Sequence, residues 1–293
     1  MMMVGTTGSL VVVGSGIQLI RQTTLETITQ IERADIVFFA VNDSATQRWI
    51  EQLNANSVTL ADCYAEGKPR HETYDEMAGR ILAAVRTGHH VCAVFYGHPG
   101  IVVDASHAAV RRARKEGFPA RMLPGVSTND CLFADLGIDP GHTGCQSFEA
   151  TNFLLRRRVF DPTSALILWQ AGVLGEPSVR KGMSCRPERL KLLTAVLRER
   201  YPARHPVVLY EAALFPICEP VIRRVRLCDL PHETVYPITT LYVPPKTQRR
   251  AVRTVMEWLD NKTPMRRPET GTTGRRSATT PAASSPRSRP RRA

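Results

Sequence analysis

The first 125 residues alternate between short apolar runs and longer segments in which apolar residues recur at helical spacing. The apolar runs have the length of buried strands and cover residues 10–13, 36–41, 91–96 and 120–123. The amphipathic segments predict helices over residues 23–33, 73–86 and 104–116. We expect Thr23 and Glu26 to form a capping box and Asp104 to be an N-cap. Strands that alternate with helices are typical of an α/β domain with a largely parallel sheet.

The second half of the chain has more strand-to-strand character than the first. It predicts helices over residues 128–136, 188–200 and 250–259. It predicts strands over residues 165–169, 207–210, 221–227 and 239–243. The run over residues 221–227 alternates apolar and basic residues, which is typical of a strand with one face in water. We therefore predict an α/β protein with an N-terminal domain over residues 1–125 and a C-terminal domain over residues 126–262.

Residues 263–293 consist mainly of arginine, serine, threonine, proline and alanine. Such a segment buries too little apolar surface to offset the entropy of ordering, so we predict a disordered basic tail. Its eight arginines and one glutamate account for about +7 of the net charge of +12. The tail has no aromatic residue on which a base could stack. A solvated terminus is therefore the simpler interpretation, nucleic acid is not an expected partner, and recruitment of an acidic peptide stays open.

The composition is that of a globular protein without a membrane anchor. The 293 residues are 43% hydrophobic and 23% charged. No stretch reaches the roughly 18 apolar residues of a transmembrane helix, and the N-terminus lacks the basic region of a signal peptide. The seven cysteines are scattered without a CxxC pair, which argues against a disulfide framework or a zinc site. We therefore expect a cytoplasmic protein with mostly reduced thiols, no metal and no membrane partner.

Three glycine-containing loops follow predicted strands, at residues 14–16, 96–100 and 124–127. In open α/β sheets, ligands bind in crevices at such strand ends. A dinucleotide-binding fingerprint would need glycine at position 19, where this chain has leucine, so that ligand class is excluded. Ordinary turns remain an alternative at each loop, with Tyr96 a packed aromatic and Ser127 a simple N-cap.

The amino-acid sequences of these segments and their order along the chain resemble the tetrapyrrole-methylase superfamily. Within it, they resemble the borosin enzymes that methylate backbone amides of peptides. The superfamily resemblance rests on VVGSG at 12–16 and LPGVS at 123–127. The borosin resemblance rests on VFYGHPG at 94–100, ARMLPGV at 120–126, DCLFADL at 130–136 and LYVPPK at 241–246. The resemblance covers roughly residues 8–260. It implies two α/β domains with S-adenosylmethionine in the cleft between them, and a homodimer in which each subunit helps to enclose its partner's site.

The resemblance also implies a cofactor pocket and a catalytic segment. The pocket residues expected from the matched motifs are Gly14, Tyr96, His98, Val102, Ser127, Gln170, Tyr210, Ala212 and Thr240. The catalytic segment covers residues 64–74, and its two tyrosines and one arginine fall on Tyr64, Arg70 and Tyr74. In the alternative interpretation, Tyr74 is a packed aromatic and Arg70 is a solvated loop charge.

These three side chains suit the chemistry of an amide. An amide nitrogen is a poor nucleophile because its lone pair is delocalised into the carbonyl, so methylation needs removal of the N–H proton. A guanidinium beside a tyrosine favours phenolate, which can act as a general base, and we favour Tyr74 with Arg70 for this role. Phenol or guanidinium donors can stabilise the imidate oxygen.

The chain also departs from the family patterns. The Gly-Pro-Gly-Asp loop of tetrapyrrole and cobalamin methylases is replaced by Gly16-Ile17-Gln18-Leu19, which argues against a porphyrinoid substrate, and Ala61 stands where some borosin enzymes have a further tyrosine. The chain shows neither the helical clasp nor the apolar core peptide of fused borosin enzymes, so we expect a separate precursor peptide as substrate. The alternatives are C-methylation of a tetrapyrrole or precorrin, ribose methylation of ribosomal RNA, and a cofactor-binding scaffold without catalysis.

Overall fold

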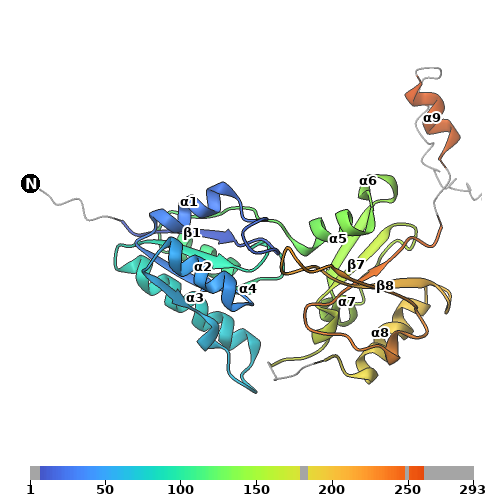
Figure 1. Cartoon of the computed structure of the whole chain (residues 1–293). Coiled ribbons are helices and arrows are strands. Elements are labelled where there is room, and N and C mark those ends of the chain that lie inside the picture. Colours follow the sequence, from blue (N-terminus) through green and yellow to red (C-terminus); the bar gives the residue numbers. More distant parts are fainter. Residues whose placement is uncertain (1–6, 179–183, 248–250, 261–293) are drawn as a thin grey trace, which may run out of the picture. The chain divides into compact units, whose positions relative to one another are not determined.

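A five-stranded parallel sheet forms the first part of the computed structural model, which describes residues 7–178, 184–247 and 251–260 (Figure 1). Its strand order is β3-β2-β4-β1-β5, and all of its paired strands run parallel. The carboxyl ends of the strands therefore share one edge of the sheet. The strands are β1 (Ser9–Gly14), β2 (Ile36–Ala40), β3 (Ser57–Thr59), β4 (His90–Phe95) and β5 (Ala120–Met122).

Helices cover both faces of this sheet, because its central strands are apolar on both sides. Leu10 and Val12 of β1 pack in the same core cluster as α3 and α4. Val11 and Val13 point to the opposite face and pack in the same cluster as α1 and α2. The helices are α1 (Leu25–Arg33), α2 (Ser44–Leu53), α3 (Arg70–Arg86) and α4 (Asp104–Lys115).

A second five-stranded sheet has the order β6-β7-β10-β8-β9 (Figure 1). Its first pair, β6 and β7, is parallel, and the other pairs are antiparallel. One face packs against α7 and α8, and the other packs against α5. The strands are β6 (Cys145–Glu149), β7 (Ala165–Trp169), β8 (Pro206–Glu211), β9 (Val221–Arg226) and β10 (Thr240–Val243). The helices are α5 (Thr128–Leu136), α6 (Pro140–Thr143), α7 (Ala150–Leu155) and α8 (Pro187–Arg198).

Both sheets belong to one compact unit that runs to Gln248, and a second unit, which begins at Arg249, contains α9 (Arg253–Leu259). The domain boundaries at residues 125 and 262 stay predictions. The predicted basic tail, residues 263–293, lies outside the described residues. Among the helices of the described ranges, none has the length and apolar character needed to cross a membrane.

Two predicted helix caps are wrong. The N-cap of α1 is Thr24, whereas Thr23 donates to the carbonyl of Ser15 at 2.7 Å, so the expected capping box between Thr23 and Glu26 does not form. Asp104 is the first residue of α4 rather than its cap. All seven cysteines have free thiols, and four of these cysteines are buried.

Candidate functional site

A cavity of about 290 Å³ lies where strand ends of the two sheets face each other. Ala40 ends β2 and Gly97 follows β4, while Gln170 and Ala212 directly follow β7 and β8. Because β10 runs antiparallel to β7 and β8, its first residue, Thr240, lies beside their last residues and also lines the cavity. The cavity thus occupies the edge at which α/β sheets bind ligands, and it is close to the roughly 300 Å³ at which small-molecule sites begin.

Close backbone contact joins the loops that follow β1 and β4. A Cβ atom on Gly14 would lie 2.1 Å from the carbonyl oxygen of Gly97 and 2.8 Å from Cδ of Pro99. Gly16 and Gly97 exchange backbone hydrogen bonds of 3.3 and 3.0 Å. Glycine is therefore required at position 14 by its backbone neighbours. Gly14 does not belong to the cavity lining, and its cofactor-binding role stays a prediction.

Two residues of the cavity wall hold unusual backbone conformations. Val102 has φ of 55° and Gln170 has φ of 58°, both in the left-handed region. This region is rare for non-glycine residues and strained for a β-branched one, and such strain gathers at ligand sites. Both residues were expected in the cofactor pocket, and both line the cavity.

Local hydrogen bonds hold the polar groups of the wall. His98 accepts a 2.9 Å hydrogen bond from the backbone N–H of Gly100 through its Nδ1. Ser127 is the N-cap of α5 and forms a capping box with Asp130. Burial raises the pKa of Tyr96 well above its ordinary value, so this phenol stays protonated at neutral pH. Ser127, which caps α5 as expected, also lines the cavity.

Seven of the nine expected cofactor residues line the cavity, and Gly14 and Tyr210 do not. Tyr210 is fully buried, and its hydroxyl donates to Oδ2 of Asp135 at 2.6 Å. Its hydroxyl proton is therefore donated to another protein group. The seven lining residues are Tyr96, His98, Val102, Ser127, Gln170, Ala212 and Thr240.

The sequence prediction missed polar and aromatic groups next to the matched motifs. Asn42, Asn129 and Trp169 all line the cavity. The indole Nε1 of Trp169 donates to Oδ1 of Asn129 at 2.8 Å, which ties β7 to α5. Two of these residues could have been found because they lie next to predicted site residues. Trp169 precedes Gln170, and Asn129 lies two residues after Ser127.

The structure brings the three expected catalytic residues to the same cavity. Arg70 and Tyr74 lie one turn apart on α3, and Nη1 of Arg70 is 3.5 Å from the hydroxyl of Tyr74. The backbone N–H of Arg70 donates to the carbonyl of Pro177 at 2.9 Å, which fixes the start of the helix. Nε of Arg70 is buried and has no hydrogen-bond partner. A buried guanidinium N–H without a partner is costly, and Arg70 is also one of the residues that line the cavity.

Tyr64 completes this wall from the loop before α3. Its side chain lines the cavity and is 40% exposed. Partial burial is the main cause that raises its pKa to about 12, the neighbouring Tyr74 adds to the rise, and the charge of Arg70 only partly offsets it. Tyr64 is therefore a hydrogen-bond donor at neutral pH rather than a phenolate.

Comparison with known proteins agrees with this geometry. The tetrapyrrole (corrin/porphyrin) methylases match residues 9–224. A methyltransferase/type I borosin cyclic peptide precursor from Coprinopsis marcescibilis is 39% identical over 269 residues, which cover 88% of this chain and 69% of that protein. The chain belongs to the tetrapyrrole methylase family, on its borosin branch. The resemblance inferred from the sequence motifs is thereby confirmed.

Other relatives are methyltransferase–precursor proteins as well. The gymnopeptide precursor of Gymnopus fusipes is 42% identical over 257 residues, covering 86% of this chain and 61% of that protein. The omphalotin A precursor of Omphalotus olearius is 42% identical over 247 residues, with coverage of 83% and 59%. The chain thus spans about three fifths of the length of these two relatives.

Solved structures confirm the predicted fold. The uroporphyrin-III C-methyltransferase of Thermus thermophilus superposes with a TM-score of 0.59 at 20% identity, covering 82% of this chain and 93% of that one. A cobalt-precorrin-4 methyltransferase gives a TM-score of 0.58 at 18% identity, with coverage of 82% and 96%. At such low identity these likenesses concern the fold alone.

Proposed function

We propose that this chain is an S-adenosylmethionine-dependent methyltransferase that acts on backbone amides of a ribosomally made precursor peptide. The observation that carries the proposal is the wall formed by Tyr64, Arg70 and Tyr74, in which a buried guanidinium N–H has no partner. This wall offers hydrogen-bond donors for an amide oxygen and a phenol beside a guanidinium for an amide proton. The relatives named as borosin precursors support a peptide as the substrate.

The remaining wall of the cavity fits the cofactor. S-adenosylmethionine supplies an electrophilic methyl group on a sulfonium when it is bound. The loop after β4 and the strained Val102 expose backbone groups, which suit the polar ends of such a ligand. Ile101, Ala212 and Ile238 provide apolar surface for an adenine ring. We expect the seven lining residues of the predicted set to hold the cofactor in this way.

Each of the three proposed catalytic side chains has its own role at the amide. The hydrogen bonds from Arg70 hold the carbonyl oxygen and favour its negative charge as the imidate forms. Tyr74, whose oxygen lies beside the Arg70 guanidinium, is placed to accept the N–H proton as a general base. Tyr64 stays protonated and donates a second hydrogen bond to the same oxygen. When bound against the seven lining residues, S-adenosylmethionine would supply the methyl group for the nitrogen that has lost its proton.

Mass spectrometry tests the proposal. The purified chain is incubated with S-adenosylmethionine and, in separate reactions, with the peptide encoded beside its gene and with the precursor segment of the Omphalotus relative. Gains of whole methyl units on the added peptide, placed on backbone amides by fragmentation, are expected, and Tyr74→Phe should abolish them. Methylation of the chain itself would contradict the separate-precursor expectation but support the reaction.

Parallel reactions test the alternatives. Methyl transfer to uroporphyrinogen or to ribosomal RNA, with none to any peptide, would refute the proposal and assign the chain another activity of its fold.

The homodimer and the cytoplasmic location are part of the same proposal. Light scattering of the purified chain should give twice the mass of one chain, and a monomer that retains full activity would refute the shared site.

A further inference from the structure

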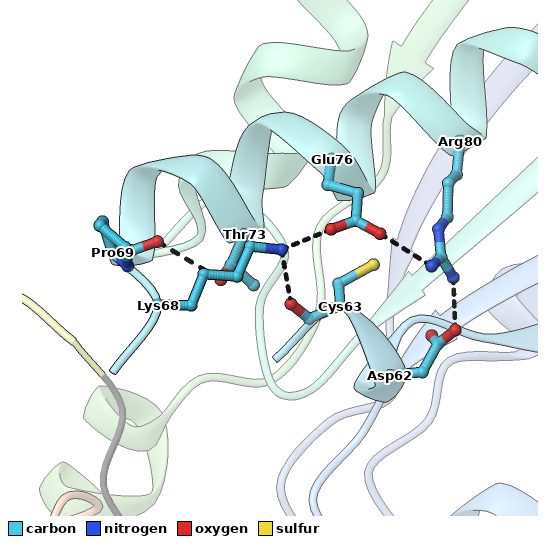
Figure 2. Close-up of polar contacts among 7 residues, drawn as sticks. All are labelled: Asp62, Cys63, Lys68, Pro69, Thr73, Glu76 and Arg80. Carbon is cyan, nitrogen blue, oxygen red and sulfur yellow. Dashed lines mark hydrogen bonds and ion pairs between the residues drawn. The ribbon is translucent and has the colours of Figure 1, made fainter. Parts of the chain in front are cut away.

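The loop that carries Tyr64 is tied to α3 by a lysine that does not touch the cavity (Figure 2). Nζ of Lys68 donates to the carbonyl oxygen of Cys63 at 2.9 Å. The same Nζ forms an ion pair with Glu76 on α3. Since Cys63 directly precedes Tyr64, the lysine fixes the peptide unit from which the tyrosine side chain departs.

The ion pair continues to the other end of the loop. Glu76 accepts from Nη2 of Arg80 at 2.8 Å, one turn further along α3. Nη1 of Arg80 is 2.7 Å from Oδ2 of Asp62, two residues before Tyr64. Four alternating charges therefore form a chain of three ion pairs from Lys68 to Asp62, as Figure 2 shows. The hydrogen bond from Lys68 to Cys63, the residue after Asp62, closes this chain into a ring. The pairing lowers the pKa of Glu76, chiefly through Lys68, and raises that of Arg80, chiefly through Asp62, so Glu76 and Arg80 are charged at neutral pH.

The loop also has backbone contacts, since the N–H of Lys68 donates to the carbonyl of Ala65 at 3.1 Å and Pro69 pairs with Ser178 in an isolated bridge. Residues 64–67 are exposed, whereas Cys63 is buried. Gly67 has φ of 76° and no neighbour near its Cα, so the turn itself adds no packing. An exposed segment of this kind takes part of its position from side-chain anchors. The ring of charges supplies those anchors on the same helix that presents Arg70 and Tyr74 to the cavity.

We propose that Lys68 and Glu76 are positioning residues, which set the place of the Tyr64 hydroxyl relative to Arg70 and Tyr74. The inference rests on the proposed function, since Tyr64 matters only if it touches the acceptor amide. Neither Lys68 nor Glu76 lines the cavity, so each acts through the loop. Misplacing a donor by about 1 Å costs up to ~100-fold in rate, so the ring is a control point for catalysis.

The test compares Lys68→Met with Arg86→Met in the full chain. Arg86 lies on the same helix and forms a two-pronged ion pair with Glu116 at 2.6 and 2.7 Å, away from the cavity lining. Each variant removes one cation and one ion pair that involves α3, so the control corrects for general destabilisation. Single-turnover methyl transfer to the peptide and binding of S-adenosylhomocysteine are measured separately.

We expect Lys68→Met to lower the single-turnover rate by about 10-fold with little change in binding, and Lys68→Arg to recover most of the loss. In a Tyr64→Phe background, Lys68→Met should change the rate by less than about twofold, because residues that act as a unit are not additive. Arg86→Met should leave the rate unchanged. Hydrogen exchange should rise in residues 62–68 of Lys68→Met and not in those of Arg86→Met.

Three results would overturn the inference while the wild-type chain methylates the peptide. They are a wild-type rate in Lys68→Met, an equal loss in both Tyr64 backgrounds, and unchanged exchange of the loop. A wild-type chain that methylates no peptide refutes the proposed function instead, so the two failures are distinguishable.

Discussion

Replacing Gly14 by alanine places a methyl group where the loops after β1 and β4 touch. The new Cβ would lie 2.1 Å from the carbonyl oxygen of Gly97, whereas real Cβ contacts stay above about 3.0 Å. The two loops would have to separate by close to 1 Å, and both are backbone, so no side chain can rotate away. Overpacking of this kind costs about 1–3 kcal/mol.

Gly79→Ala is the matched control for this substitution. Gly79 lies within α3, and a Cβ there would meet nothing within 4 Å. Alanine is favoured over glycine in a helix by about 1 kcal/mol, so this variant should be more stable than the wild type. The same chemical change thus has opposite expected signs at the two positions.

Urea unfolding and calorimetric binding of S-adenosylhomocysteine measure the two effects. We expect Gly14→Ala to lower the free energy of unfolding by about 1–3 kcal/mol and, by shifting the cavity wall, to weaken binding by about tenfold. Wild-type stability and affinity in Gly14→Ala would refute the close approach of the loops. Weakened binding at wild-type stability would instead support the direct cofactor contact expected from the sequence.

Three further substitutions test the site and its surroundings. Arg70→Met should reduce methyl transfer by at least about 100-fold in a single-turnover assay. Urea unfolding should change little, because Nε of Arg70 has no protein partner and the hydrogen bond from Nη1 to Tyr74 is long at 3.5 Å. Tyr201→Phe should leave the free energy of unfolding unchanged or raise it by up to about 1 kcal/mol, since its buried hydroxyl has no partner, and a clear loss in urea unfolding would contradict this. Tyr64 keeps its proton in the folded chain up to about pH 12 but loses it near pH 10 when the chain is unfolded. The free energy of unfolding should therefore fall as the pH rises between these values. Urea unfolding at each pH should show a less steep fall in Tyr64→Phe.

The first sheet was predictable because its strands are apolar on both faces and leave a plain run in the sequence. Two elements of the same part of the chain, α2 and β3, were not predicted. Their size does not explain this, because α1 buries as few residues as α2 and β5 is as short as β3, and both were predicted. The exact cap of α1 also escaped, because Thr23 and Thr24 are equivalent in sequence and only the path of the chain past Ser15 separates them.

Most of the candidate site was predictable from motifs that end at or follow a strand. Residues such as His98 and Gln170 follow a strand, Thr240 begins one, and all three line the cavity. Tyr210 lies within β8, where side chains alternate between faces, and its buried side chain packs with α5 and donates to Asp135. A motif match gives the neighbourhood of a residue but not the face of the strand on which it lies.

The proposed function assigns ligand binding and catalysis to different parts of the chain. The wall that fits the cofactor is built from loops at strand ends, whose position depends on glycine contacts such as that of Gly14. The catalytic wall comes from the start of α3 and the loop before it, which are held by Pro177 and by the charged ring around Lys68. Changes at Gly14 should therefore appear first in cofactor affinity, and changes at Lys68 first in the methyl-transfer step. If both changes moved both quantities equally, the cavity would be one mechanical unit, and the roles assigned to its two walls would have to be merged.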